Sequence, residues 1–485
     1  MNLQKEQTGK MTNFRWTVVA MLFAATTINY LDRQVLSLTW DEFIKPEFHW
    51  NESHYGTITS FFSIFYAISM LFAGRFVEWM GTKKGFLWAI GIWSFGACLH
   101  AGAGIVTEAY VGLGSAAELA AATGDVAVVI ATVSMWAFLV ARGVLALGEA
   151  GNFPAAIKAT AEYFPKKDRA YATSIFNAGA SIGALFAPLT IPPLAKAFGW
   201  EMAFIIIGAI GFLWMGFWIF LYDDPAKSKR VNKLELAYIR QDDEEAEENV
   251  EKKEKKVSLK QCFSFKQTWA FVAGKFMTDG VWWFFLFWTP SYLNTQFDIK
   301  TSEGLGMALI FTLYLIVTIL SIYGGKLPTL IINRSGQNPY EARMKAMLIF
   351  AFFPLVVLLA QPLGMHFDYL GRHAAWIPVL LISIGCAAHQ AWSANLFSTI
   401  GDMLPQGAIA TVTGIGGMAG GIGSMLLQKG AGNLFHYAGE TNMTFMGFEG
   451  KPAGYFIIFC VCAFAYLIGW SIMKSLVPKY QVVTL

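Results

Sequence analysis

The sequence predicts an all-α membrane protein of twelve transmembrane helices, arranged as two six-helix halves. Its 485 residues are 55% hydrophobic and only 14% charged, whereas soluble proteins contain about 25% charged residues. Apolar runs of about 20 residues, the length that crosses a bilayer, recur along the whole chain. One strongly charged segment separates six of these runs from the other six.

The apolar runs and the charged segment define the expected elements in order. The spans are expected at 14–38, 56–79, 84–104, 130–160, 169–192, 203–222, 268–296, 303–326, 343–362, 374–403, 408–430 and 453–476. The N-terminal half is 1–222, the charged linker 223–267 and the C-terminal half 268–485. The linker contains "RQDDEEAEENVEKKEKK", and charge blocks of this kind stay solvated. We expect it to be cytoplasmic, with a helix along the surface and no catalytic role.

Lysine and arginine are distributed unevenly between the two sides of the predicted membrane. The side with both termini and the linker holds 26 of them, and the other side holds six. Because cytoplasmic loops are enriched in these residues, both termini are expected in the cytoplasm. Two longer segments, 105–129 and 436–453, then lie outside, the first as a helical hairpin.

Two six-span halves joined by a basic linker are typical of secondary transporters, which bind substrate between the halves.

Several classes of function are disfavoured by composition. A net charge of +3 gives no indication of nucleic-acid binding. The five cysteines have neither metal-ligand nor disulfide spacing, so no metal and no cofactor are expected. A membrane enzyme or a receptor is the alternative class, but an enzyme should show a nucleophile–base set or metal ligands, and this chain offers neither. The protein is therefore not expected to be an enzyme, and a monomer in the lipid bilayer is expected.

Charged residues inside predicted spans are the candidate functional residues, because even low estimates put their cost at about 2.5–3.5 kcal/mol each. Asp32 and Arg33 lie in span one, and Arg142 and Glu149 in span four. Arg142 and Glu149 are seven residues apart, almost two helical turns, and so share one face. Two structural alternatives remain open: the span-one pair may only clamp span four, and Arg142 could reach water at the membrane surface.

Arginine in a wet cavity implies an anionic substrate, because its planar fork binds a carboxylate through two parallel bonds. A substrate carboxylate that occupies the arginine would favour protonation of Asp32 or Glu149, and by reciprocity protonation would favour binding. These acids are the predicted proton-coupling residues. The other predicted substrate-binding residues are polar or aromatic side chains with packing as the alternative, namely Tyr30, Asn177, Lys275, Trp283, His389, Gln390 and Asn395.

The short loop between spans two and three carries a gating motif, "GRFVEWMGTKKG" at 74–85. It resembles the Gly-x-x-x-Asp-x-x-Gly-x-Arg/Lys-Arg/Lys signature of the major facilitator superfamily, with Glu78 in place of the aspartate. Gly74 and Gly81 would permit close helix approach and a tight turn, and Lys83 and Lys84 supply the basic pair. The alternative is an ordinary basic cytoplasmic loop. The resemblance implies the major facilitator fold.

Two longer stretches are similar to one branch of that superfamily. "NYLDR" and "ARGVLALGEAGNFPAAIKATAEYFPKKDRAYATSIFNAGASIGA" resemble the anion:cation symporters. The resemblance implies that Asp32, Arg33, Arg142 and Glu149 bind substrate carboxylate and carry protons, and that Tyr66 binds substrate.

The second half is most similar to the hexuronate permeases of the branch, through "KFMTDGVWWFFLFWTP" and "GCAAHQAWSANLFSTIGDMLP". The implied function is proton-coupled symport of galacturonate or glucuronate by alternating access, in a bacterial inner membrane. Ala180 stands where aldonate permeases have a binding glutamine, which leaves the partner of the sugar hydroxyls open. The alternative is a symporter of another organic anion, such as an aldonate or an acidic amino acid, with sodium as a possible coupling ion.

Overall fold

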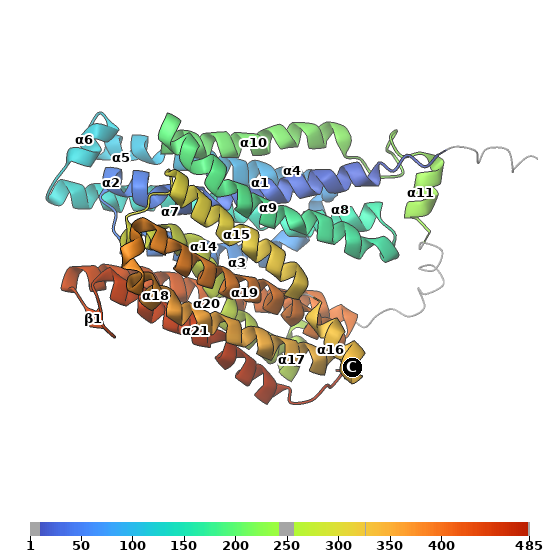
Figure 1. Cartoon of the computed structure of the whole chain (residues 1–485). Helices are drawn as coiled ribbons and strands as arrows, with labels where there is room; N and C mark the ends of the chain where they lie inside the picture. Colours follow the sequence, from blue (N-terminus) through green and yellow to red (C-terminus); the bar gives the residue numbers. More distant parts are fainter. Residues whose placement is uncertain (1–9, 242–256, 325, 484–485) are drawn as a thin grey trace, which may run out of the picture.

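The computed structural model describes residues 10–241, 257–324 and 326–483 and is a bundle of long helices (Figure 1). The first half contains α1 (Arg15–Thr39), the π-helical segment η1 (Trp40–Ile44), α2 (Lys45–Phe48), α3 (Glu52–Met80), α4 (Thr82–His100), α5 (Ala103–Val111), α6 (Ala116–Ala121), α7 (Asp125–Glu149), α8 (Asn152–Tyr163), α9 (Lys166–Phe198) and α10 (Trp200–Leu221). The linker contains α11 (Lys233–Ile239) and α13 (Leu259–Ser264).

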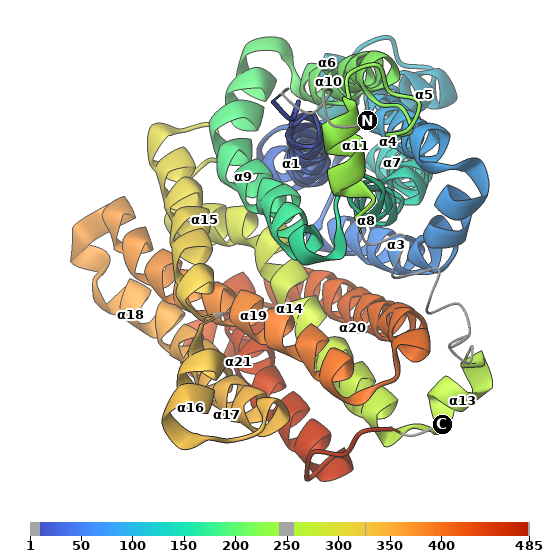
Figure 2. The ribbon, with the colours of Figure 1, turned by 90° about the vertical axis from the view of Figure 1, so that its right-hand side faces the viewer.

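The second half completes the bundle. It contains α14 (Lys266–Phe297), α15 (Gly304–Gly324), α16 (Leu327–Ser335), α17 (Pro339–Phe352), the 3₁₀ segment η2 (Phe353–Leu359), α18 (Ala360–His366), the 3₁₀ segment η3 (Asp368–Ala375), α19 (Trp376–Met403), α20 (Gln406–Thr441), β1 (Thr444–Phe445), β2 (Phe448–Glu449) and α21 (Lys451–Leu476). The two strands pair antiparallel in a small hairpin. Viewed along the helices, the two halves lie as separate groups on either side of a central region (Figure 2).

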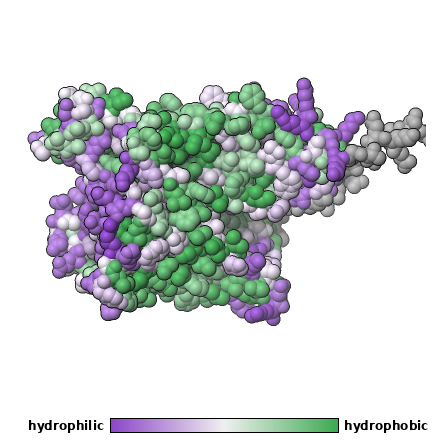
Figure 3. Space-filling model, turned by 45° about the horizontal axis from the view of Figure 1, so that its top comes forward, coloured by the Kyte–Doolittle hydropathy of each residue, from purple (hydrophilic) through white to green (hydrophobic). Residues whose placement is uncertain are grey.

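The outer surface of the bundle matches a membrane protein. A hydrophobic band crosses the middle of the molecule, and hydrophilic residues gather towards its two ends (Figure 3). Within the described residues, eight helices are long and apolar enough to span a bilayer, or nine if the bent pair α4–α5 forms one span. The long helices α1, α14 and α20 run among them and are more polar, because they carry the interior charges and glycines. The predicted all-α membrane fold is thereby confirmed.

Three expected elements differ in detail. Span nine is not one α-helix, since η2 interrupts it at Pro354, which cannot donate a backbone hydrogen bond. The expected outer loop at 436–453 begins later than predicted, because α20 continues to Thr441 and stops where Asn442 adopts a left-handed conformation (φ 47°). The other outer segment holds α5 and α6, with α5 continuing from α4 across a 44° bend.

The two halves are joined at one end of the bundle. We call the end with α2, α5, α6 and the β-hairpin the distal end, and the end with α11 and both chain termini the terminal end (Figure 1). Glu42 of η1 accepts hydrogen bonds from Thr301 (3.2 Å) and from the backbone (3.1 Å) and hydroxyl (2.5 Å) of Ser302. Glu52 pairs with Lys451 at 2.6 Å.

The helices α3 and α20 form the most intimate contact between the halves. A Cβ added to Gly56 would lie 2.8 Å from the Cα of Gly432, so the two backbones touch. The innermost polar link is the 3.0 Å contact between the hydroxyls of Ser63 and Ser424. From this level to the terminal end, no hydrogen bond or ion pair joins the halves among the described residues. The halves are therefore closed at the distal end and unlinked by polar contacts at the other.

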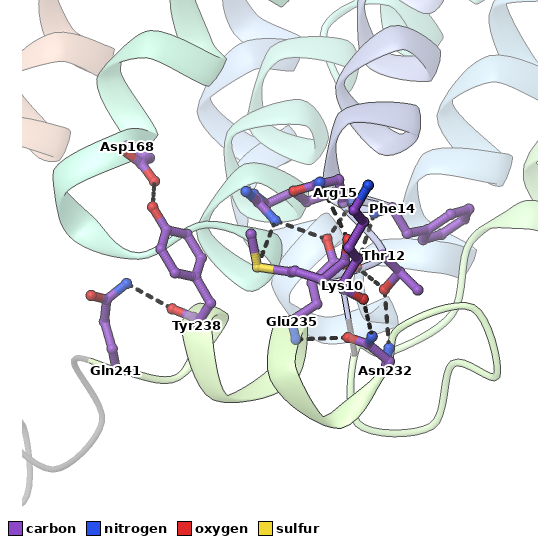
Figure 4. A network of polar contacts seen from close by, with 11 residues as sticks. Lys10, Thr12, Phe14, Arg15, Asp168, Asn232, Glu235, Tyr238 and Gln241 are labelled. Carbon is purple, nitrogen blue, oxygen red and sulfur yellow. Dashed lines mark hydrogen bonds and ion pairs between the residues drawn. The ribbon is translucent and has the colours of Figure 1, made fainter. Parts of the chain in front are cut away.

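The first part of the linker is fastened to the N-terminal half (Figure 4). Glu235 of α11 is fully buried and accepts hydrogen bonds from Thr12 (2.5 Å), from the backbone of Phe14 (2.9 Å) and from Arg15 (3.0 and 3.1 Å). Its carboxylate thus satisfies free N–H groups at the start of α1, where a negative charge is favoured. Tyr238 donates to Asp168 at the start of α9 (2.5 Å). The predicted surface helix is a clasp across two membrane helices.

The Glu235 contacts predict a pH-dependent contribution to stability. Burial alone would raise the pKa of Glu235, but the donors from Arg15, Thr12 and Phe14 outweigh it and hold the pKa below its usual 4.5. Glu235→Gln should therefore lower the free energy of unfolding by about 1–3 kcal/mol at neutral pH. Because the folded-state pKa is depressed, this contribution is complete above the usual pKa and is lost as pH falls through the depressed one.

Melting temperatures of the purified protein in detergent, measured from pH 7 down to pH 3, test this prediction. The curves of wild type and Glu235→Gln should converge in acid. Glu440→Gln, at an exposed site on α20, is the matched control and should follow wild type throughout. A constant gap between wild type and Glu235→Gln at all pH values would show that the charge of Glu235 is not what stabilises the clasp.

Candidate functional site

The candidate site is built around a break in the fourth long segment, between α7 and α8. Pro154 lacks an amide hydrogen and cannot bond to the carbonyl of Ala150, so the helix interrupts there. Just before the break, a Cβ on Gly148 would lie 2.3 Å from the backbone nitrogen of Trp93. The backbones of α7 and α4 therefore touch at this level. Glu149, the last residue of α7, follows this contact directly and is fully buried.

Arg33 of α1 binds Glu149 across the interior of the N-terminal half. The Nε and Nη2 of Arg33 donate to the same oxygen, Glu149 Oε2, at 3.1 and 2.8 Å. The other oxygen, Oε1, has no hydrogen-bond partner among the described residues. Both side chains are almost completely buried, at 4% and 0% exposed. The carboxylate thus uses half of its acceptor capacity, and the guanidinium keeps Nη1 outside this ion pair.

Aromatic rings surround the Arg33 guanidinium. Its Cζ lies 4.9 Å from the ring centre of Tyr30, 4.7 Å from Tyr66 and 4.9 Å from Trp283. Trp283 belongs to α14, so the C-terminal half contributes to the surroundings of a charge held by the N-terminal half. Cation–π contacts of this kind are stronger when the cation is shielded from water.

Arg142 and Asp32 lie in the same buried region, and neither has an ion-pair partner within the part of the chain that the structure describes. Arg142 is 2% exposed, and its Cζ sits 5.2 Å from the Phe62 ring. Asp32 is 1% exposed, and neither of its carboxylate oxygens has a hydrogen-bond partner among the described residues. Both groups are close enough to Glu149 to interact with its charge electrostatically. The four charged residues that the sequence singles out in spans one and four are therefore brought together, but only Arg33 and Glu149 pair directly.

A cavity between the halves opens beside this cluster. Its walls come from α1, α9, α14, α15 and α19, and its volume is about 100 Å³. Tyr30 lines the cavity and also contacts Arg33, so it connects the two. Asn177 and Gln390, also predicted as binding residues, lie in the wall with Ala180. The cavity is thus shared between the halves, as a transporter site requires.

The other predicted residues of the C-terminal half lie outside this wall. His389 bonds to the Tyr466 hydroxyl at 2.8 Å and stacks on Trp282, in the packed interior. Asn395 is 3% exposed and donates to the carbonyl of Ala391 at 2.8 Å. These contacts are those of packing residues in this conformation. His389 therefore touches the cavity wall only from behind, through Trp282, and neither residue has a described contact with Arg33.

Lys275 forms an ion pair within its own helix. Its ammonium lies 2.6 Å from Asp279 Oδ2 and 4.6 Å from the ring centre of Phe397. A Cβ on Gly420 of α20 would lie only 2.2 Å from the same oxygen of Asp279, so the pair is pressed against that helix.

The predicted gating motif surrounds the turn between α3 and α4. Gly81 has φ +78°, which explains its place at the tight turn. A Cβ on Gly74 would meet no atom within 4 Å, so no helix approaches it closely in this conformation. Glu78 and Lys84 are exposed, while Lys83 binds Asp223, the first residue of the linker, at 2.8 Å. The motif thus makes no described polar contact to the C-terminal half, as expected where the halves are apart.

Sequence reasoning missed several residues that the fold brings to the site. Phe62 lies close to both guanidiniums, at 5.8 Å from Arg33 and 5.2 Å from Arg142. Its position four residues before Tyr66, on the same face of α3, was an available signal. Ser181, Tyr314 and Thr318 line the cavity. Nothing in their local sequence distinguishes them from other polar residues of membrane helices.

The chain is similar to a known family and to curated transporters. The family model described as Major Facilitator Superfamily matches residues 22–427. The hexuronate transporter of Escherichia coli (strain K12) is 28% identical over 425 residues, which cover 88% of each chain. The galacturonate transporter of Dickeya chrysanthemi is 27% identical over 294 residues, covering 61% of this chain and 76% of the relative.

Solved structures share the fold at much lower sequence identity. The D-xylose–proton symporter aligns with a TM-score of 0.67 and 14% identity, covering 97% of this chain and 100% of that one. A bacterial homologue of the human lysosomal transporter Spinster, inward-facing and unoccupied, aligns with a TM-score of 0.66 and 16% identity, covering 96% and 98%.

Two helical halves with a shared central cavity and buried charges are the architecture of a membrane transporter. The family match then settles the class more narrowly. The chain belongs to the major facilitator superfamily.

Proposed function

We propose that this protein co-transports a hexuronate, galacturonate or glucuronate, with protons by alternating access between its two halves. The observation that carries the proposal is the buried Arg33–Glu149 pair beside a cavity shared by both halves. The similarity to hexuronate and galacturonate transporters supports the choice of substrate. Residues Arg33, Arg142, Tyr30, Tyr66, Trp283, Asn177 and Gln390 bind the sugar acid, with Asp32 and Glu149 as the proton-coupling groups.

Exchange of carboxylates at Arg33 couples the two fluxes. The guanidinium binds Glu149 through one oxygen only, and a substrate carboxylate can offer both oxygens to the same fork. When the substrate displaces Glu149, that carboxylate is left in a buried site without its counterion. Such a site strongly favours the neutral acid. Glu149 then takes up a proton, and each binding event promotes the other.

Asp32 is the second proton-carrying group in this mechanism. It is buried without a hydrogen bond to any described residue, and a bare buried carboxylate is costly unless it is neutral or paired. Arg142 is the nearby cation that can stabilise its charged form. The unpaired Arg142 guanidinium is also available to a second oxygen of the substrate. The net charge of the four residues is zero, which lets the empty site persist in a low-dielectric interior.

The bundle is assigned an inward-facing conformation in the bacterial inner membrane. The excess of Lys and Arg at the terminal end supports a cytoplasmic location for that end and for both chain termini. The polar contacts between the halves lie at the distal end, which is then the closed outer side. A monomer has all the groups that this mechanism needs.

Lys275 is expected to tune the preference among sugar acids. Its pair with Asp279 lies on α14, the helix that supplies Trp282 to the cavity. Lys275→Ala should change the ratio of KM values for galacturonate and glucuronate by about three- to tenfold without abolishing transport. Lys266→Ala, at an exposed position of the same helix, is the control. An unaltered ratio would assign the Lys275–Asp279 pair to structure alone.

Uptake by proteoliposomes containing the purified full chain tests the proposed function. A panel of uronates, aldonates, aldarates and acidic amino acids is offered with a pH gradient or a sodium gradient imposed separately. Accumulation of uronates driven only by the pH gradient is expected. Accumulation driven only by sodium would show that sodium, not the proton, is the coupling ion. Accumulation of aldonates or glutamate alone would show that the substrate is not a hexuronate.

A further inference from the structure

The cavity is lined by polar side chains without a hydrogen-bond partner among the described residues. Tyr30, Asn177, Ser181, Tyr314 and Gln390 all line it, and none of their side chains has a hydrogen bond to another described residue. Most hydroxyls in these membrane helices bond to a backbone carbonyl one turn earlier, as Thr190 of α9 does at 3.0 Å. The cavity therefore concentrates unused hydrogen-bonding capacity from α1, α9, α15 and α19.

Tyr314 illustrates the point most clearly. Its side chain is buried, at 5% exposed. Its hydroxyl has no hydrogen bond to a described residue, yet it is not completely enclosed by protein atoms. The hydroxyl therefore reaches accessible space, and the space that Tyr314 lines is the cavity. Tyr292 of α14 is the contrast, since its hydroxyl is fully enclosed and has no hydrogen-bond partner in the described parts of the chain. Next to Tyr314, Thr318 donates its proton to the Tyr314 carbonyl at 2.8 Å, so its oxygen can only accept.

The two ends of the cavity differ in chemistry. At one end Tyr30 contacts the Arg33 guanidinium, which attracts a carboxylate. Towards α15 and α19 the lining offers neutral hydroxyl and amide groups, with no charged residue in the described wall. A ligand that satisfies both ends has a carboxylate at one end and several hydroxyls on the carbons remote from it.

We propose that Ser181, Tyr314 and Thr318, together with Gln390, form a hydroxyl-recognition wall that determines which carboxylates are carried. This inference rests on the proposed function and deepens it by assigning the specificity residues. The wall selects polyhydroxylated acids and rejects aliphatic or aromatic carboxylates of similar size. A ligand without hydroxyls would strip water from these polar groups without replacing it, and sites of this kind discriminate strongly.

The wall also joins the two halves through the ligand. Ser181 belongs to α9 of the N-terminal half, whereas Tyr314 and Gln390 belong to α15 and α19 of the C-terminal half. Helices α9 and α15 pack against each other across the interface. A hydroxylated ligand that bonds to both sides stabilises their approach, so the contacts that select the substrate also favour closure around it.

The test measures KM for glucuronate and galacturonate by counterflow in proteoliposomes containing full-length variants. Tyr314→Phe and Ser181→Ala each remove one hydroxyl and should raise KM about five- to thirtyfold, the loss of one hydrogen bond to a ligand. Tyr292→Phe and Ser174→Ala are the matched controls, since Tyr292 is enclosed elsewhere and Ser174 of α9 bonds to the Tyr171 carbonyl at 2.7 Å. Both controls should keep wild-type KM.

Binding of a set of monodeoxy glucuronates tests the same residues by removing hydroxyls from the ligand. At least one deoxy compound should bind wild type weakly and lose no further affinity in Tyr314→Phe or Ser181→Ala. Because it is made on wild type, this measurement tests the hydroxyl contacts even when a variant fails to fold. Unchanged KM values in both variants, or wild type binding all deoxy compounds as well as glucuronate, would overturn the wall. Failure of wild type to carry any sugar acid would instead overturn the proposed function, and the wall with it.

Discussion

Replacement of Glu149 by Gln is expected to abolish proton-driven accumulation while exchange of substrate between the two sides continues. Glutamine keeps the shape of the side chain but cannot take up a proton, so the fluxes are uncoupled. Arg33 loses its internal competitor, since both of its donors currently bind Glu149 Oε2. Wild type with one coupled proton should accumulate substrate about tenfold per unit of pH gradient. The variant should reach only the external concentration.

Counterflow and pH-driven uptake, measured in the same proteoliposomes, separate the two outcomes. Glu118→Gln, at an exposed position in the distal region, is the control and should accumulate substrate like wild type. Persistent pH-driven accumulation in Glu149→Gln would move the coupling role to another group, with Asp32 the first to examine. Loss of counterflow as well would assign Glu149 to the integrity of the site.

Arg33→Lys is expected to weaken substrate binding by about 10- to 150-fold. Lysine keeps the charge but offers a point donor in place of the planar fork, so the two-pronged contact with a carboxylate is lost. The loss of one charge-assisted hydrogen bond is worth about 1.5–3 kcal/mol. The guanidinium also lies 4.7–4.9 Å from the centres of three aromatic rings, within cation–π range, and a lysine ammonium would not stack on them as a planar guanidinium does.

Calorimetric titration of glucuronate into the detergent-purified variant measures this effect. Arg230→Lys is a suitable control, because Arg230 is exposed and bonds to the Phe220 carbonyl outside the bundle interior. A folded Arg33→Lys protein with wild-type affinity would remove the substrate-binding role of Arg33. The site would then have to depend on Arg142, which has no ion-pair partner among the described residues.

The membrane fold was predictable because its signals are local. Apolar runs of bilayer length and the charged linker are visible in the sequence itself. The ends of helices were less predictable. Helix α20 continues past the expected end at 430, because nothing before Asn442 stops it. The interruption at η2 also depends on how Pro354 is accommodated by its neighbours.

The site was predictable where residues share a helix face or are rare in membranes. Arg142 and Glu149 could be placed together by their spacing alone, and Asp32 and Arg33 by their cost in lipid. Which acid pairs with which base is a tertiary fact: Arg33 pairs with Glu149, and Arg142 does not. His389 illustrates the opposite case, because its bond to Tyr466 depends on how α19 meets α21.

The contact between Gly56 and Gly432 has a mechanical consequence. Interdigitated side chains must change rotamer before two helices can separate, and each such change adds to the barrier. Here the surfaces are bare backbone, with the two glycines close enough that even a methyl group would collide. Two backbone surfaces of this kind can separate and meet again without rearrangement of side chains between them. The halves are then held together by the polar contacts at the distal end, and the alternating access that we propose would require these contacts to break while the backbone surfaces simply separate.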